Sequence, residues 1–148
     1  MRLALLFAVV AAIAMMLGLM RWPSIHWHLA QAFEHAAAPE QAVIASIFDG
    51  LNTYVGNYIG EFLGELSFSM FFLLTSVVWL NGLRARWIGW AGLATGVSGF
   101  VGAFRNVTAV VAPFAEVNNY LLPAFMIVLG IAFMRWSPSV SSERLTRA

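Results

Sequence analysis

The residues of this sequence with the clearest chemical potential are two glutamates four positions apart, Glu61 and Glu65, at the edge of a long apolar segment. At this spacing both carboxylates lie on one face of a helix. Arg105 ends a later apolar segment, and its guanidinium can hold a carboxylate through two parallel hydrogen bonds. An ionised carboxylate below the lipid headgroups is costly without a partner or water. We therefore predict that Arg105 pairs with Glu61 or Glu65.

Further polar residues are expected at the same level of the membrane as this pair. They are Asn106, Glu116, Asn118 and Asn119. Two interpretations of the resulting polar cluster stay open. In the first, the cluster is an ion-pair network that fixes how the helices pack. In the second, it is an outward-facing site for a solute, an ion or a proton, because ionisable residues within a membrane mark such sites.

The histidines could suggest a bound metal or haem. His28 and His35 are seven residues apart and share a helical face, but His26 and His28 point to different faces. No further ligands converge on them, and the chain has no cysteine to supply a thiolate. We expect imidazoles at the membrane interface near Trp22 and Trp27, with no metal and no cofactor. Motifs for hydrolytic or nucleotide chemistry are also lacking, so no catalytic residue and no enzyme is predicted.

The composition places these residues in a membrane. The chain has 148 residues, of which 61% are hydrophobic and 10% charged, and its mean hydropathy is +0.80. A soluble domain is about 45–50% apolar and about 25% charged. Seven acidic and eight basic residues could not cover a soluble core of this size. The net charge of +1 gives no indication of nucleic acid as a partner, so the expected partner is the lipid bilayer.

The apolar segments predict four membrane spans, because about 20 helical residues cross about 30 Å of hydrocarbon. These spans are residues 3–20, 61–80, 87–104 and 115–134. The first is kept as a span, since its apolar run is longer than the roughly 7–15 residues of a signal peptide and no small-residue cleavage site follows. Pro23, just after this run, is expected to end the first helix.

The segment between the first two spans is more polar. Pro39 and Glu40 are typical of a helix start, and the next apolar residues keep helical spacing on one face. We predict an amphipathic helix over residues 39–57 at the outer interface, with a continuous run into the second span as the alternative. Residues 1–136 then form a single all-α membrane domain, a bundle of about four spans, and residues 137–148 form a polar cytoplasmic tail.

The arginines predict the orientation. With four spans, Arg21 and Arg105 fall on one side of the membrane. The other side receives Arg2, Arg84, Arg86, Arg135, Arg144 and Arg147. The positive-inside rule then places both termini in the cytoplasm. The exclusive use of arginine as the basic residue, with abundant alanine and glycine, is typical of a GC-rich bacterial genome, so the expected location is the bacterial inner membrane.

Glycines are spaced for close helix packing. Gly56, Gly60 and Gly64 recur every four residues around the start of the second span, and Gly92 and Gly96 do so in the third. Small residues at this spacing let two helices approach closely. We expect these glycines to form packing seams. The alternative is that the close backbones frame a polar pocket.

Two motifs carry a resemblance to a known family: Asn52-Thr-Tyr54-x-Gly56-x-x-x-Gly60-Glu61-x-Leu63-Gly64 and Leu83-Arg-Ala-Arg86-Trp87-Ile-Gly89-Trp90-x-Gly92. Over roughly residues 42–135 the chain resembles an uncharacterised family of small multi-span bacterial membrane proteins. In that family a Gly-Glu-x-x-Gly helix precedes a Pro-Arg-Trp-Leu-Gly turn, and members often have extra N-terminal spans. Ala85 stands where the family tends to have proline. The resemblance implies a shared helical fold and an important Glu61, but no activity.

These features favour a non-catalytic accessory or scaffolding subunit, whose glycine-rich spans pack against copies of themselves or against a larger membrane complex. The rival interpretation is a small transporter or channel-like protein, as a homo-oligomer, that uses Glu61, Glu65 and Arg105. A third is a membrane enzyme or redox subunit built on the histidines.

Overall fold

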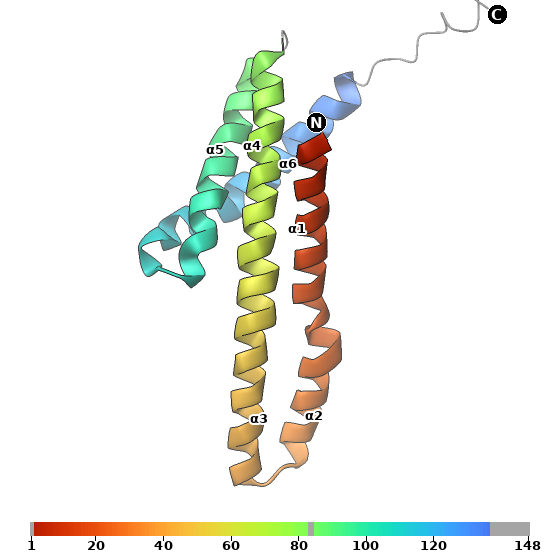
Figure 1. Ribbon diagram of the computed structural model, residues 1–148, viewed down its shortest axis with the longest axis vertical. Coiled ribbons are helices and arrows are strands. Elements are labelled where there is room, and N and C mark those ends of the chain that lie inside the picture. The colour runs from red at the N-terminus through yellow and green to blue at the C-terminus, as the bar shows by residue number, and fades with distance from the viewer. Residues whose placement is uncertain (1, 83–84, 137–148) are drawn as a thin grey trace, which may run out of the picture.

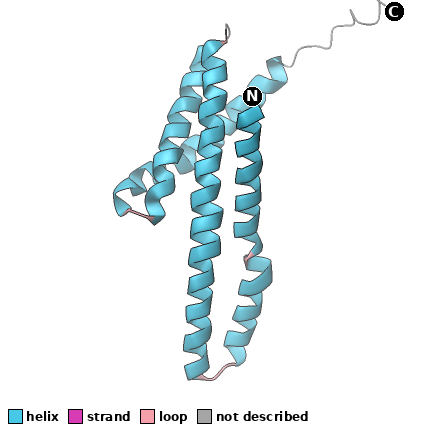
Figure 2. Ribbon diagram, viewed as in Figure 1, coloured by secondary structure: helices cyan, strands magenta, loops and turns pink. Residues whose placement is uncertain are grey.

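The computed structural model describes residues 2–82 and 85–136. Within these residues the chain is helical almost throughout and contains no strand (Figure 2). Four continuous helical stretches are long and apolar enough to cross a membrane, which confirms the predicted all-α fold. Arg84 and the predicted tail at 137–148 lie outside the described residues.

The first helical stretch is longer than a membrane is thick. α1 (Arg2–Met20) continues through a π-helical segment, η1 (Trp22–His26), into α2 (Trp27–His35). At about 1.5 Å per residue, α1 alone covers about 30 Å of hydrocarbon, so α2 extends beyond it. Pro23 does not end the helix as expected. It sits in the first turn of η1, where a missing N–H is tolerated, and the His26 N–H reaches back five residues to the Arg21 carbonyl oxygen at 2.9 Å.

The second stretch runs without interruption from α3 (Ala38–Leu51) through a π-helical segment, η2 (Asn52–Leu63), to α4 (Gly64–Asn81). Its 44 residues would extend about 66 Å at the rise of an α-helix, about twice the hydrocarbon thickness. Residues 39–57 are helical and lie in line with α4 (Figure 1). They therefore continue the second span, which is the arrangement the sequence left as the alternative to a separate interfacial helix.

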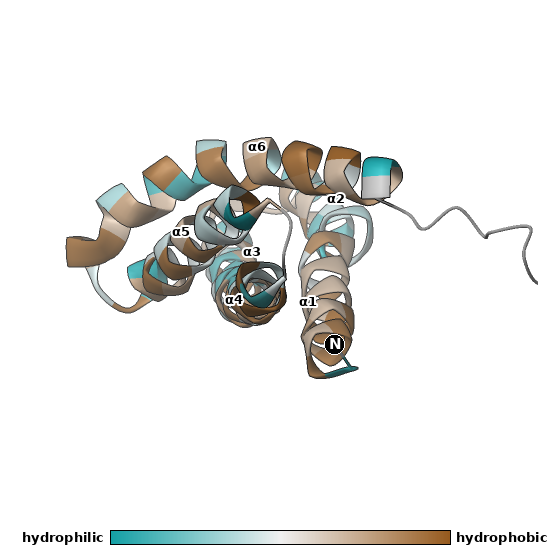
Figure 3. Cartoon of the chain, turned by 90° about the horizontal axis from the view of Figure 1, so that it is seen from above, coloured by the Kyte–Doolittle hydropathy of each residue, from teal (hydrophilic) through white to brown (hydrophobic). Residues whose placement is uncertain are grey.

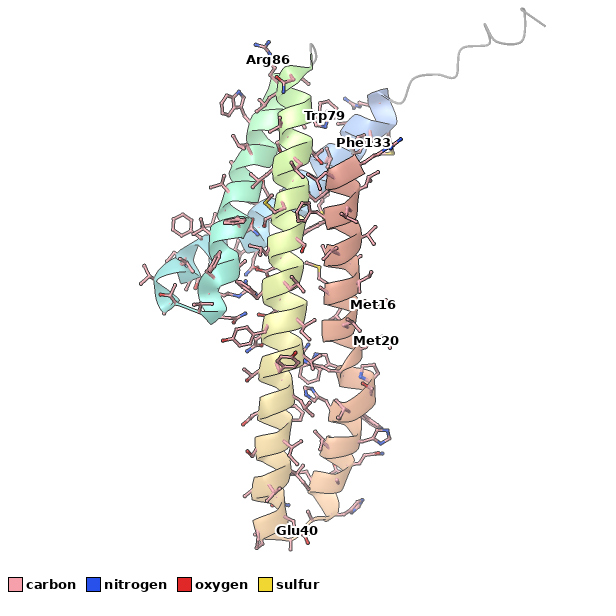
Figure 4. All side chains as sticks on the ribbon, viewed as in Figure 1. Met16, Met20, Glu40, Trp79, Arg86 and Phe133 are labelled. Atoms are coloured by element: carbon pink, nitrogen blue, oxygen red, sulfur yellow. The ribbon has the colours of Figure 1, made fainter. Side chains whose placement is uncertain are left out.

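The last two helical stretches lie beside one end of this long pair. α5 (Arg86–Gly102) packs along α4 and ends in a 3₁₀ turn, η3 (Ala103–Asn106). A second short turn, η4 (Ala109–Val111), leads to α6 (Ala112–Trp136). Seen from above, α4 lies between α1 and α5, and α6 runs along one side of this group (Figure 3). The other end of the pair, which includes Glu40, extends well beyond these helices (Figure 4).

The hydrophobic core lies between α4, α5 and α6. Phe72, Ile88 and Phe125 are buried there together with Leu129 and Ala132. The rings of Phe72 and Phe125 meet edge to face, with their centroids 5.2 Å apart. Interdigitated large side chains thus join these three helices.

α1 packs against the long second stretch by a different means. It buries only small residues, and its leucines, valines and methionines are largely exposed, as suits a helix that faces lipid. A Cβ placed on Gly18 would lie 2.6 Å from the Gly60 Cα, and one placed on Gly64 would lie 2.8 Å from the Met15 side chain. The backbones of α1 and η2 are therefore in direct contact.

The glycines of α5 allow a similar approach to α4. A Cβ on Gly92 would lie 2.3 Å from the Ser76 Oγ, and one on Gly96 would lie 2.9 Å from the Leu73 side chain. The two glycine series thus face different neighbours, with Gly60 and Gly64 against α1 and the α5 glycines against α4. This places α4 at the centre of the bundle.

Candidate functional site

Arg105, at the end of the α5 stretch, holds both glutamates. Its Nη2 donates to Glu61 Oε2 at 2.9 Å and to Glu65 Oε1 at 2.8 Å, and its Nη1 donates to Glu65 Oε2 at 2.5 Å. The contact with Glu65 is bidentate, the geometry in which an arginine holds a carboxylate most firmly. The predicted pairing of Arg105 is confirmed, and it includes both carboxylates.

This group, which we call the Arg105 clamp (Glu61, Glu65 and Arg105), joins two separate helical stretches. Glu61 lies in η2, Glu65 in the first turn of α4, and Arg105 in the 3₁₀ turn η3. Asn106 strengthens the junction, because its Nδ2 donates to the Asn57 carbonyl oxygen at 3.0 Å and to Glu61 Oε2 at 3.4 Å. The clamp holds two carboxylates and one guanidinium, so its formal charge is −1.

The other predicted members of the polar cluster lie apart from the clamp. Glu116 and Asn119 are exposed on α6 and make no hydrogen bond or ion pair within the described part of the chain. Asn118 is buried, but it faces α5 at Gly99, where an added Cβ would lie 2.9 Å from its Nδ2. Apolar span length predicts the depth of a residue in the membrane but not its lateral position. The start of α6 packs against the end of α5, where a Cβ placed on Gly102 would lie 2.9 Å from the Ala115 Cα.

Arg21 occupies a position that its place in the sequence does not indicate. Its Nε donates to Asn52 Oδ1 at 3.1 Å, its Nη1 donates to the Gly18 carbonyl oxygen, and its guanidinium carbon lies 4.9 Å from the centroid of the Trp22 ring. A Cβ placed on Gly56 would lie 2.7 Å from the same carbon. One signal was available, because Arg21 and Arg105 are the two arginines that depart from the positive-inside pattern.

A cavity of about 270 Å³ opens between the C-terminal end of α1 and the η2–α4 junction. Arg21, directly after α1, lines one side of it, and Glu61 and Glu65 line it from the facing stretch. Gly56 and Gly60 also line the cavity, so the glycine series contributes both to close packing and to a polar pocket. The site therefore presents both signs of charge within one small space.

The histidines do not come together. His26 is only 2% exposed and stacks on Phe48, with ring centroids 4.0 Å apart, while Trp22 meets its edge at 5.0 Å. Neither ring nitrogen has a hydrogen-bond partner in the described residues. His28 and His35 are exposed on α2, and within the described ranges no group of three or more His, Cys, Asp or Glu side chains could hold a metal. His26 thus acts as an aromatic packing residue between η1 and α3.

Comparison with protein-family models, curated proteins and solved structures finds no match for this chain. The resemblance described above therefore stays a prediction. In the structure Ala85 has a φ of 50°, in the left-handed region. The ring of proline fixes φ at about −65°, so a proline at this position would not fit the observed backbone conformation.

Proposed function

We propose that this protein is a non-catalytic scaffolding subunit of the bacterial inner membrane, with both termini in the cytoplasm and a partner-binding hairpin on the outer side. The hairpin, which we call the outer arm, consists of residues 22–51. The observation that carries the proposal is the length of the second helical stretch, 44 residues, where about 20 would cross the membrane. A helical projection of this size has no role in crossing lipid.

The outer arm has the internal contacts of a defined structure. His26 stacks on Phe48 across the arm, and the Gln41 Nε2 donates to the Phe33 carbonyl oxygen at 3.0 Å. At the start of α3 the Glu40 carboxylate accepts a hydrogen bond from the Ala37 N–H at 3.3 Å. These contacts support an arm that keeps its shape when a partner approaches.

One face of the arm is apolar and uncovered. Val43 and Ile47 on α3 are 59% and 47% exposed, and Tyr54, just beyond them in η2, is 65% exposed. Their spacing puts them on one side of the continuous helix. An apolar stripe of this kind beyond the hydrocarbon suits a partner helix laid along it.

The charge of the arm favours a basic partner. Between residues 22 and 60 the sequence contains Glu34, Glu40 and Asp49 and no arginine or lysine. Glu34 and Asp49 stand at an apolar cavity of about 380 Å³ between α2 and α3. An acidic surface speeds and orients the approach of a basic one. The partner that fits best combines an apolar ridge with flanking basic residues.

The Arg105 clamp supports the same assignment. Both Nη atoms of Arg105 are bonded to carboxylates, and the clamp ties the η2–α4 junction to the end of α5. An ion-pair network of this kind holds helices in register. The clamp therefore fixes the helical stretch from which the arm extends.

A second function, a small transporter or channel-like protein, is favoured by one observation. Polar side chains continue inward from Glu65 along α4, where Ser69 and Ser76 are buried, and the Ser76 Oγ has no hydrogen-bond partner in the described residues. The space beside them is filled, however, because Cβ atoms placed on Gly99 and Gly92 would lie 2.5 and 2.3 Å from the two hydroxyls. The close packing favours the scaffold.

One experiment separates these two functions. A photoreactive amino acid is placed at Val43 of the arm and, as the control, at Ile13 of the lipid-facing α1, and adducts are identified in native membranes. The scaffold predicts a protein adduct of one discrete mass at Val43 and none at Ile13. In parallel, purified wild type and Glu65→Gln are compared in proteoliposomes. Flux that depends on Glu65, or the lack of a protein adduct at Val43, would contradict the proposed function.

A further inference from the structure

Two charged atoms at the cavity between α1 and η2 have no hydrogen-bond partner in the described part of the chain. Arg21 uses Nε for Asn52 and Nη1 for Gly18, which leaves Nη2. Glu61 uses Oε2 for Arg105 and Asn106, which leaves Oε1. Both side chains line the same cavity of about 270 Å³. The cavity therefore offers one cationic donor and one anionic acceptor to a bound molecule.

The charges around the cavity favour a ligand that carries both signs. Arg105 neutralises one of the two clamp carboxylates, and Arg21 balances the other, so the four groups sum to zero. An anion attracted to Arg21 would be repelled by the uncompensated carboxylate charge of the clamp. A lone cation attracted to the clamp would be repelled by the guanidinium of Arg21. A zwitterion satisfies both groups at once.

The spacing of the two groups leaves room for such a ligand between them. Arg21 lies against Gly56 of η2. Glu61 follows Gly56 by five residues in η2, which places it roughly 7 Å further along the axis of that helix. No ion pair joins Arg21 to an acidic residue within the described residues. At about 270 Å³ the cavity is slightly below the roughly 300–1,000 Å³ of typical ligand clefts, so it suits a small polar group.

The position of the cavity indicates where the ligand comes from. Arg21 follows the 19 residues of α1, so its side chain lies at headgroup level, about 30 Å from the start of the helix. Met15 and Leu19 supply an apolar wall. Met16 and Met20 on the same end of α1 are exposed where lipid tails would run (Figure 4). A molecule held here has its polar part in the cavity and its apolar part along α1.

We propose that this cavity binds the headgroup of a zwitterionic phospholipid with a primary ammonium group. Arg21 donates to the phosphate, and Glu61 accepts from the ammonium. A quaternary ammonium has no N–H for Glu61, and a phosphoglycerol headgroup has no cation for it. Binding is therefore selective for phosphoethanolamine over phosphocholine and phosphoglycerol. This inference does not depend on partner binding by the outer arm.

The test measures lipid binding to the purified protein in detergent by native mass spectrometry. The probes are short-chain phosphatidylethanolamine, phosphatidylcholine and phosphatidylglycerol with identical acyl chains. We expect the ethanolamine lipid to bind about tenfold more tightly than the other two, the effect of losing one charged hydrogen bond. Arg21→Gln and Glu61→Gln should each reduce its binding to the level of the choline lipid. The exposed controls Arg135→Gln and Glu116→Gln should leave the preference unchanged.

Several results would overturn the proposal: equal affinity for the three lipids, an unchanged preference in both cavity variants, or tail-free phosphoethanolamine that binds as tightly as the lipid. The last result would show a site for a soluble zwitterion. If a cavity variant fails to fold, a photoreactive phosphatidylethanolamine is applied to the wild-type protein. It should label residues 15–21, and the unlabelled ethanolamine lipid should suppress this labelling where the choline lipid does not. Labelling that both lipids suppress equally counts against the proposal.

Discussion

Arg105 donates two parallel hydrogen bonds to Glu65, from Nη1 to Oε2 at 2.5 Å and from Nη2 to Oε1 at 2.8 Å. The two residues are 40 positions apart in the chain, and their contact ties the end of the α5 stretch to the first turn of α4. Their side chains are 26% and 23% exposed, so water screens the pair only in part. The pair therefore holds the two stretches in register, and loss of Arg105 would leave partly buried carboxylates without a cation.

Removal of the Arg105 guanidinium should destabilise the bundle, and the effects of removing Arg105 and Glu65 should not add. Arg105→Gln leaves two carboxylates without a cation, and we expect the free energy of unfolding to fall by about 2 kcal/mol, less than for a fully buried pair because of the residual exposure. The double variant with Glu65→Gln should lose less than the sum of the single losses. Thermal denaturation in mild detergent measures both. Strictly additive losses would show that the two side chains do not interact, and Arg135→Gln serves as the control.

The contact between Gly18 and Gly60 leads to a second prediction. Gly60→Ala places a Cβ 2.9 Å from the Gly18 Cα, so α1 must move away and stability should fall by about 1–3 kcal/mol. Gly50 is the matched control, because a Cβ there meets nothing within 4 Å. Gly50→Ala should be neutral or stabilising by up to about 1 kcal/mol, the helix preference for alanine. Equal effects of the two changes on the melting temperature would contradict direct contact between α1 and η2.

His26 tests the packing of the outer arm. His26→Phe keeps the stack on Phe48 and removes two buried nitrogens that have no partner, so the arm should be as stable as in wild type or more so. His26→Ala removes the ring and should loosen the arm by about 2–4 kcal/mol. Hydrogen exchange of the α3 amides reports the difference. Faster exchange in His26→Phe than in wild type would mean that the imidazole nitrogens are used.

Ala85 tests the turn before α5. Ala85 has a φ of 50°, a backbone conformation that destabilises a residue with a Cβ by about 1–2 kcal/mol. Glycine has no Cβ and adopts this conformation without that strain. We expect Ala85→Gly to raise the melting temperature, whereas Ala91→Gly in the middle of α5 should lower it because glycine weakens a helix by about 1 kcal/mol. Ala85→Pro should be the most destabilising of the three. A stabilising Ala85→Pro would show that this backbone conformation is absent in the protein.

Two physical constraints made much of the fold predictable. Hydrocarbon thickness fixed the number of spans, and the cost of an ionised carboxylate in lipid required a cation for Glu61 and Glu65, which Arg105 supplies. The remaining features depend on tertiary structure. The continuation of the first helix past Pro23 depends on a local change to π-helical hydrogen bonding, which has no reliable sequence signal.

Other differences have a geometric origin. Span length predicts a depth for Glu116 in the membrane, but its separation from the clamp depends on how α6 packs against α5, which depth does not determine. The sequence places Arg21 only on one side of the membrane, since its packing against Gly56 requires the two helices to be side by side. In both cases the sequence does not reveal which helices lie side by side.

The most direct test concerns the continuity of the helix from Ala38 to Asn81. Because the chain has no cysteine, Val43→Cys and Val78→Cys introduce the sole attachment sites for two spin labels, and both positions are exposed. Pulsed electron resonance in lipid nanodiscs then gives the distance between them. A continuous helix predicts one narrow distribution near 50 Å, at about 1.5 Å per residue. A distance well below this, with the label at position 43 accessible to lipid-soluble relaxants, would mean that the arm bends into the interface and would contradict the account.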